Sequence, residues 1–383
     1  MNNQHTYIDH NATTRLDPRV LEVMLPYMSD QYGNATSRHV YGRSARQAIE
    51  RAREQVADAV EAHPSQIVFT ASGTESNNFI VRGIAALHLD KALAISAIEH
   101  PCVTKPAEAM RQIGCRVNTI AVSANGLLST ASLQSCLTSP TSLVSAMLAN
   151  NETGVMQPVA EMAELAKQHG ALMHTDAVQV LGKMPVSFSD LNVDAMTISS
   201  HKIGGPQGAG ALVLDKRIDI QPLMMGGGQE KGLRSGTENL AAIVGFGAAC
   251  ELIKNELKMR SSSTQALREQ LEAGLKQLGA SIFGNSVARL PNTSFFAFEG
   301  IEGETMLLAL DRKGYAIASG SACSSDSTEP SHVLLAMGVE EYLARGALRV
   351  SFASQNTSQE VDGFLLALAS ELTRLKQMTA IAV

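Results

Sequence analysis

The chain has 383 residues, of which 45% are hydrophobic, so it can bury a full core as one large α/β domain or as two domains. Its formal net charge of −6 comes from 31 basic and 37 acidic residues without a basic block, which excludes a protein built to bind nucleic acid or an anionic membrane surface. The expected partners are small molecules or other proteins.

The first residues, MNNQHTYIDHNATT, lack the basic and apolar regions of a secretion signal, and no later stretch reaches the ~18 uncharged apolar residues that a membrane helix requires. We therefore expect a cytoplasmic protein without a membrane partner. The 5 cysteines are an odd number without C-x-x-C spacing, which argues against a disulfide framework and a zinc knuckle. Cys115, Cys136 and Cys250 lie in apolar or helical contexts and are expected in the core.

Short β-branched or apolar runs alternate with amphipathic segments along much of the chain. The runs expected to form strands are residues 66–70, 93–98, 142–149, 171–176, 194–199 and 210–215. Strands and helices that alternate in this way form a mostly parallel sheet with helices on both faces. From about Asn239 to Leu278 the pattern is helical with charged faces, and shorter α and β elements follow. We expect a large α/β domain followed by a smaller α+β domain.

Polar residues just after these runs are candidate site residues, because ligands of open α/β sheets bind beyond the carboxyl ends of the strands. The stretch TASGTESNN places Ser72, Gly73 and Thr74 before an amphipathic segment. Small residues at a helix start can bind phosphate through their N–H groups and the positive end of the helix dipole. They are also typical of an ordinary helix cap, formed here by Ser72 or Thr74.

Three further stretches carry residues with more than one interpretation. His100 precedes Pro101 in AIEHPC, where a structural hydrogen-bonding role competes with a catalytic one. Asp176 ends a predicted strand in HTDAVQ, with Gln179 three residues on; the aspartate can cap a helix or hold a buried cation. Lys202 lies in SSHKIGGPQGAG, where it is either a solvated cation or a nucleophile whose pKa is lowered by desolvation.

Cys323 differs from the other cysteines because its surroundings, SGSACSSDSTEPSH, are small, polar and turn-forming. Cysteine is usually among the most buried residue types, so this context predicts a thiol on a mobile loop at about residues 319–332. This observation alone fits two interpretations of Cys323: an incidental loop cysteine, or a nucleophile that moves with its loop.

A phosphate cradle, an acid, a lysine and a stacking ring are the parts that a pyridoxal phosphate site needs. In their order, these motifs resemble the cysteine desulfurases of the NifS/IscS type, in the class V aminotransferase group of fold-type I pyridoxal phosphate enzymes. The resemblance runs nearly end to end, through YIDHNATTRLDPRV, GNATSRHVYGRSAR, NNETGVMQP, GGGQEKGLRSGTEN and GALRVSF as well as the stretches above. It implies a large domain at 16–258 with a mostly parallel seven-stranded sheet, and a small α+β domain formed by 1–15 and 259–383.

The resemblance also implies a role for each candidate residue. Lys202 would bond covalently to pyridoxal 5'-phosphate and move protons on the substrate, Asp176 would pair with the pyridine nitrogen, and His100 would stack on the ring as a further catalytic residue. The other implied cofactor-binding residues are Gly73, Thr74, Asn151, Gln179, Ser199, His201 and Thr237. Thr237 would come from the neighbouring subunit of a homodimer. Arg349 would bind the substrate carboxylate, and Asn151 would also contact the substrate.

The implied reaction is the transfer of sulfur from L-cysteine to Cys323, which releases L-alanine and leaves a persulfide for an acceptor such as an iron–sulfur scaffold protein. Cys323 would also be able to serve as a transient ligand of a [2Fe-2S] cluster through that persulfide.

Departures from the common pattern, namely His10, Gln207, Ala353 and Ser354, leave the polarity of the substrate mouth and the acceptor open. A selenocysteine lyase or aminotransferase of the same fold is the first alternative, and Cys323 argues against the aminotransferase. A non-catalytic sulfur carrier is the second, and the presence of Lys202, Asp176 and His100 argues against it.

Overall fold

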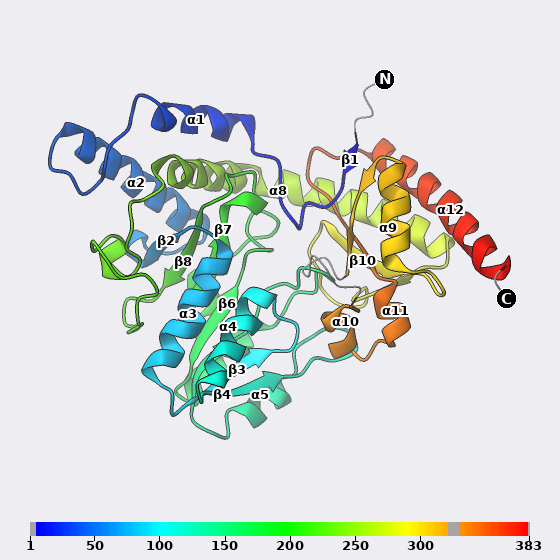
Figure 1. Cartoon of the computed structure of the whole chain (residues 1–383), viewed down its shortest axis with the longest axis horizontal. Helices are drawn as coiled ribbons and strands as arrows, with labels where there is room; N and C mark the ends of the chain where they lie inside the picture. Colours follow the sequence, from blue (N-terminus) through cyan, green and yellow to red (C-terminus); the bar gives the residue numbers. More distant parts are fainter. Residues whose placement is uncertain (1–4, 321–328, 382–383) are drawn as a thin grey trace.

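The computed structural model describes residues 5–320 and 329–381, and Cys323 therefore lies outside the described residues. A seven-stranded sheet forms its centre (Figure 1). The strands lie in the order β2 (Ile67–Thr70), β8 (Gly210–Leu214), β7 (Ala195–Ser199), β6 (Leu172–Asp176), β5 (Thr141–Ser145), β3 (Ala92–Ser96) and β4 (Arg116–Ile120). Neighbouring strands are parallel except that β8 pairs antiparallel with β2 and β7. The predicted mostly parallel sheet is confirmed.

Four of the inner strands, β3, β5, β7 and β8, are buried along their whole length, which explains their apolar sequences. Alternate residues of β8 enter different cores: Leu212 and Leu214 pack on one face of the sheet, and Ala211 and Val213 pack on the other. The sequence pattern does not predict β4, because this strand lies at the sheet edge and most of its residues are partly or fully exposed.

Helices cover both faces of this sheet (Figure 1). The helices and short 3-10 turns of this part are α1 (Pro18–Met28), α2 (Val40–Ala59), η1 (Pro64–Gln66), α3 (Gly73–Leu87), α4 (Pro101–Gln112), α5 (Thr130–Cys136), α6 (Val159–Gln168), α7 (Phe188–Leu191), η2 (Ser200–Lys202) and η3 (Glu230–Gly232). Residues of α3 and α4 form one core with the sheet, whereas α2 and α6 contribute to the core of the opposite face. Cys115, Cys136 and Cys250 are buried, as expected.

A second, smaller region is built on a four-stranded antiparallel sheet in the order β12 (Ala318–Ser319), β13 (Leu348–Ser351), β10 (Thr293–Ala297) and β9 (Ser281–Ile282). The N-terminal strand β1 (Thr6–Tyr7) joins this region by pairing parallel with β11 (Tyr315–Ala316). Its helices are α9 (Gly303–Arg312), α10 (His332–Ala336), α11 (Glu341–Arg345) and α12 (Ser358–Ile381).

The long helix α8 (Leu240–Gln277) runs between the two regions (Figure 1). Its first half packs with α1 and α2, and its second half contributes Leu267, Leu271 and Leu275 to the core of the smaller region. The predicted boundary between residues 258 and 259 falls inside this continuous helix, so the division into domains stays a prediction. Within the described residues, no helix combines the length and apolar character needed to cross a bilayer.

Candidate active site

A cavity of about 250 Å³, the strand-end cavity, lies at the carboxyl ends of the parallel strands of the central sheet. It is lined by Ala12, Ser72, Gly73, Thr74, Asn77, His100, Cys102, Met147, Ala149, Asn151, Asp176, Val178, Gln179, Ser199, His201 and Lys202. The tertiary structure therefore brings together every predicted cofactor-binding residue except Thr237. These predicted residues come from five separate stretches of the chain, each of which follows a strand of the central sheet.

One end of the cavity is formed by the N-terminus of α3. Ser72 caps this helix, since its hydroxyl accepts a hydrogen bond from the backbone N–H of Glu75 at 3.1 Å. A β-carbon at Gly73 would lie 2.9 Å from Val178, so glycine is needed for the helix to start so close to the cavity wall. The buried hydroxyl of Ser199 faces this end and has no hydrogen-bond partner among the described residues. The stretch is a helix cap, as one interpretation predicts, and its geometry suits an anion, so phosphate binding here stays a prediction.

Asp176 lies at the end of β6 with its carboxylate held by neutral donors. Its Oδ2 accepts from the side-chain amide of Asn77 at 2.7 Å, and its Oδ1 accepts from the backbone N–H of Val178 at 2.9 Å. The group is 7% exposed. A buried carboxylate without a cationic partner in these contacts is suited to bind a protonated ring nitrogen of a ligand.

Lys202 ends the 3-10 turn η2 after β7 and lines the cavity. The preceding His201 is tied to the N-terminal segment: its Nδ1 lies 3.1 Å from Thr13 Oγ1, and its carbonyl accepts from Thr14 Oγ1 at 2.8 Å. Burial, with a smaller contribution from the charge of Lys202, lowers the pKa of His201 to about 4. At neutral pH His201 is therefore an uncharged hydrogen-bonding residue.

His100 is the N-cap of α4, as its position before Pro101 predicts. Its Nδ1 accepts from the backbone N–H of Cys102 at 3.2 Å and lies 2.9 Å from Cys102 Sγ. Burial lowers the pKa of His100, and the nearby carboxylate of Asp176 partly opposes that shift. The ring is thus a neutral, fixed wall of the cavity.

Gln179 connects the cavity to the N-terminal segment. Its amide nitrogen donates to the carbonyl of Asn11 at 3.1 Å, and its amide oxygen accepts from Lys183 Nζ at 2.7 Å. Burial lowers the pKa of Lys183 well below its usual range, and the charges of Lys202 and Arg349 act in the same direction. These two hydrogen bonds fix the orientation of the Gln179 side-chain amide, with its nitrogen toward Asn11 and its oxygen toward Lys183.

Arg349, on β13, is 5% exposed and lies beside the cavity rather than in its lining. Its guanidinium donates to Asp9 Oδ1 at 2.7 Å and to the backbone carbonyl of Asn151 at 3.0 Å, while its buried Nε has no partner among the described residues. The arginine is therefore held next to Asn151, which does line the cavity, by contacts from both regions of the molecule.

Besides Arg349, two further predicted site residues are not placed in this cavity. Thr237 is exposed and does not line the cavity. Cys323, which is also the predicted cluster ligand, lies outside the described residues. Conversely, the sequence reasoning missed Asn77 and Cys102. The spacing of four residues from Gly73 to Asn77 puts both on one face of α3 and could have identified Asn77.

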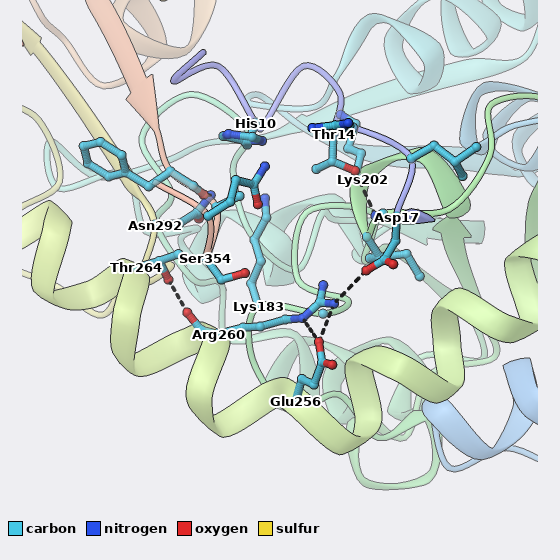
Figure 2. A pocket seen from close by; sticks show the side chains of 18 of the residues that line it. His10, Thr14, Asp17, Lys183, Lys202, Glu256, Arg260, Thr264, Asn292 and Ser354 are labelled. Atoms are coloured by element: carbon cyan, nitrogen blue, oxygen red, sulfur yellow. Dashed lines mark hydrogen bonds and ion pairs between the residues drawn. The ribbon is translucent and has the colours of Figure 1, made fainter. Parts of the chain in front are cut away.

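A second, larger cavity of about 460 Å³, the α8 cavity, also has Lys202 in its lining (Figure 2). Its two carboxylates, those of Asp17 and Glu256, form ion pairs with arginines. Arg19 contacts Asp17 at 2.7 Å and Glu256 at 2.6 Å, and Arg260 contacts Glu256 at 2.7 Å. These ion pairs link the start of α1 to the middle of α8.

Three of the departures noted in the sequence, His10, Ala353 and Ser354, line the α8 cavity (Figure 2 labels His10 and Ser354), and none of them lines the strand-end cavity. Gln207 lines neither cavity. These substitutions therefore leave the walls of the strand-end cavity unchanged.

The chain matches the family model described as aminotransferase class-V over residues 6–364. It is 42% identical over 380 residues to a cysteine desulfurase of Enterobacter agglomerans, a match that covers 98% of this chain and 94% of the relative. Among solved structures it is similar to a NifS-like protein, with a TM-score of 0.91 and 39% identity over 96% of this chain and 99% of the other. A structure described as SspA in complex with cysteine has a TM-score of 0.81 and 34% identity, and covers 92% of this chain and 99% of its own.

Proposed function

The chain belongs to the class V aminotransferase family, and we propose that it is a pyridoxal phosphate-dependent cysteine desulfurase. The observation that carries this proposal is the strand-end cavity, in which an amine (Lys202), a buried carboxylate (Asp176), an imidazole (His100) and a helix N-terminus converge. The full-length similarity to a cysteine desulfurase and the similarity to a protein whose structure contains cysteine support L-cysteine as the substrate.

The residues of the cavity fit pyridoxal 5'-phosphate. The N-terminus of α3 and the Ser199 hydroxyl, which has no partner among residues 5–320 and 329–381, would hold the phosphate. The Asp176 carboxylate would pair with the pyridine nitrogen. When bound, this cofactor supplies an electron-withdrawing ring that withdraws charge from the substrate carbon.

Residues of the chain would attach the cofactor, orient the substrate and transfer protons. The Lys202 amine would hold the cofactor aldehyde and move protons at the substrate carbon. Arg349 lies beside Asn151, and its buried Nε has no partner in the part of the chain that the structure describes. Its planar guanidinium matches a carboxylate, so it would orient the amino acid. His100 would face the substrate across the cavity and exchange protons there.

Cys323 would be the sulfur acceptor. Its thiolate would attack the sulfur of the bound L-cysteine; the carbon–sulfur bond breaks, a sulfur–sulfur bond forms, and the carbon takes up a proton. The products are L-alanine and a persulfide on Cys323, so no external oxidant or reductant is consumed. We further propose that the persulfide passes to an acceptor protein of the iron–sulfur scaffold class and that the reaction takes place in the cytoplasm.

The test is the formation of L-alanine from L-cysteine by the purified protein, with sulfide released in equal amount when a thiol reductant is present. Cys323→Ser should keep the visible absorbance of the bound cofactor and lose alanine formation, whereas Lys202→Ala should lose both. A protein that releases alanine only from selenocysteine is a selenocysteine lyase. A protein that is colourless after incubation with the cofactor contradicts the proposal.

We also propose that the active enzyme is a homodimer with shared sites. Apolar side chains are exposed over α1 and the segment that leads into α2, among them Leu25, Met28, Tyr32 and Val40, which are 52–66% exposed. Thr237 is exposed and away from its own strand-end cavity, as a residue that serves the partner's phosphate site would be.

Mixing two inactive variants tests the shared site. Thr237→Asp should repel the phosphate in the partner's site, and Lys202→Ala removes the essential amine. Hybrid dimers refolded from both contain one site with both native residues, so activity should return. Failure of the mixture to regain activity, with dimers present, contradicts the assignment of Thr237.

A further inference from the structure

Cys102 is a second thiol at the candidate active site, and the reaction above gives it no part. It lines the strand-end cavity on the first turn of α4 and is 9% exposed. Its sulfur lies between two polar side chains: His100 Nδ1 is 2.9 Å away on one side and Asn77 Nδ2 is 3.0 Å away on the other.

The direction of each hydrogen bond follows from the donors available. The backbone N–H of Cys102 donates to His100 Nδ1 at 3.2 Å, so this ring nitrogen carries no proton. Burial raises the pKa of the Cys102 thiol to about 12, so the sulfur keeps its hydrogen at neutral pH. The thiol hydrogen therefore points at His100 Nδ1, which then accepts from two donors.

On its other side the sulfur accepts a hydrogen bond. Asn77 Nδ2 donates both to Cys102 Sγ and, at 2.7 Å, to Asp176 Oδ2. Asn77 is fully buried, so no water competes for its amide. A continuous set of hydrogen bonds thus leads from the Asp176 carboxylate through Asn77 and Cys102 to the imidazole of His100.

We propose that Cys102 is a positioning residue that holds His100 as the neutral imidazole with its proton on Nε2. Two donors at Nδ1 leave Nε2 as the only nitrogen that can carry the hydrogen of the neutral ring. They also oppose a second proton at Nδ1, so the ring resists conversion to imidazolium. His100 then presents a fixed N–H donor from Nε2. The consequence for turnover rests on the proposed function, whereas the protonation state does not.

Several charged or titratable groups face the ring from other elements, and the variants below leave them in place. They are Asp176 on β6, Lys202 on η2, His332 on α10 and Arg349 on β13. Asp176 favours a charged imidazole, whereas Lys202, His332 and Arg349 act in the opposite direction.

The experiment is nitrogen-15 NMR of the histidine rings in the holoenzyme over a range of pH, with His100 identified by the signals lost in His100→Gln. Cys102→Ser keeps a side-chain donor, a hydroxyl, at Nδ1, whereas Cys102→Ala removes the side-chain donor and leaves only the backbone N–H. Cys136→Ala is the matched control, since Cys136 is 8% exposed and does not line the strand-end cavity.

We expect the native protein, Cys102→Ser and the control to show a neutral His100 with its proton on Nε2. In Cys102→Ala the pKa of His100 should move upward, and the acid limb of the pH profile of kcat should move with it. A His100 signal that titrates alike in all four proteins overturns the proposal and leaves Cys102 as a space-filling residue. A proton found on Nδ1 of the native neutral ring overturns it as well. The NMR readout does not require turnover, so it separates this inference from the proposed function.

Discussion

The strand-end cavity and the α8 cavity are both lined by Lys202, but the carboxylates in their walls have different partners. In the α8 cavity, Asp17 and Glu256 are matched by Arg19 and Arg260 across the wall. In the strand-end cavity, the contacts of the Asp176 carboxylate are with neutral N–H groups. A carboxylate that already forms an ion pair links two elements of the protein. A carboxylate whose hydrogen-bond donors are neutral can still pair with a positively charged group of a ligand.

Cavity volume is therefore a poor indicator of which cavity is the candidate active site. The α8 cavity is the larger of the two, at about 460 Å³ against about 250 Å³. Its ion pairs connect α1 and α8, so we expect substitutions there to change stability and not chemistry. Substitutions in the strand-end cavity should instead change the catalytic rate and leave stability unchanged.

The largest effect should come from a matched pair of aspartates. Asp176→Asn removes the charge expected to pair with the cofactor ring and should lower kcat by on the order of 10²-fold or more. Asp17→Asn weakens only the ion pairs near α8, so kcat should stay unchanged and the free energy of unfolding should fall by no more than about 1 kcal/mol. Steady-state kinetics and urea unfolding measure both. An Asp17→Asn variant as inactive as Asp176→Asn would remove the distinction between the cavities.

Two glutamates should give opposite dependences of stability on pH. Near the strand-end cavity, burial raises the pKa of Glu99 from 4.5 to about 8. Between these values the folded protein keeps a proton that the unfolded chain has lost, so this group makes stability fall as pH rises. Beside the α8 cavity, the hydrogen bond from Arg19 lowers the pKa of Glu256 below 4.5, so its contribution is present above pH 4.5 and is lost as pH falls below it.

The measurement is the free energy of unfolding in urea from acid to mildly alkaline pH. Glu99→Gln should flatten the curve between pH 4.5 and about 8, and Glu256→Gln should flatten it only at acid pH. Parallel curves for Glu99→Gln and the native protein would show that Glu99 does not retain its proton in the folded state.

The smallest effect should be the coupling between Arg19 and Glu256. Their contact is short, but the Arg19 side chain is 52% exposed, so solvent and salt screen it. A double-mutant cycle with alanine at both positions should give a coupling of about 0.5 kcal/mol or less, which shrinks as salt is added. A coupling that is large and independent of salt would mean that the α8 cavity is drier than its exposed arginine indicates.

Much of the site could be predicted because its residues follow strands. The ends of β6 and β7 and the helix starts after β2 and β3 carry Asp176, Lys202, Ser72 and His100, and local patterns identify each of these positions. The edge strand β4 could not be predicted, since its exposed face carries polar residues and breaks the apolar pattern. The direction of β8 could not be predicted either, because a buried strand has the same apolar sequence in both orientations.

The α/β class, the helix starts near Ser72 and His100 and the order of the polar stretches could be predicted from the sequence, since these depend on local backbone preferences and on short-range apolar patterns. Which side chains share hydrogen bonds is known only from the folded structure. Asn77 meets Asp176 across 99 positions, and Arg349 meets Asp9 across 340. Such contacts depend on how the strands are ordered and how the two regions pack. They therefore cannot be predicted from the local sequence around either residue.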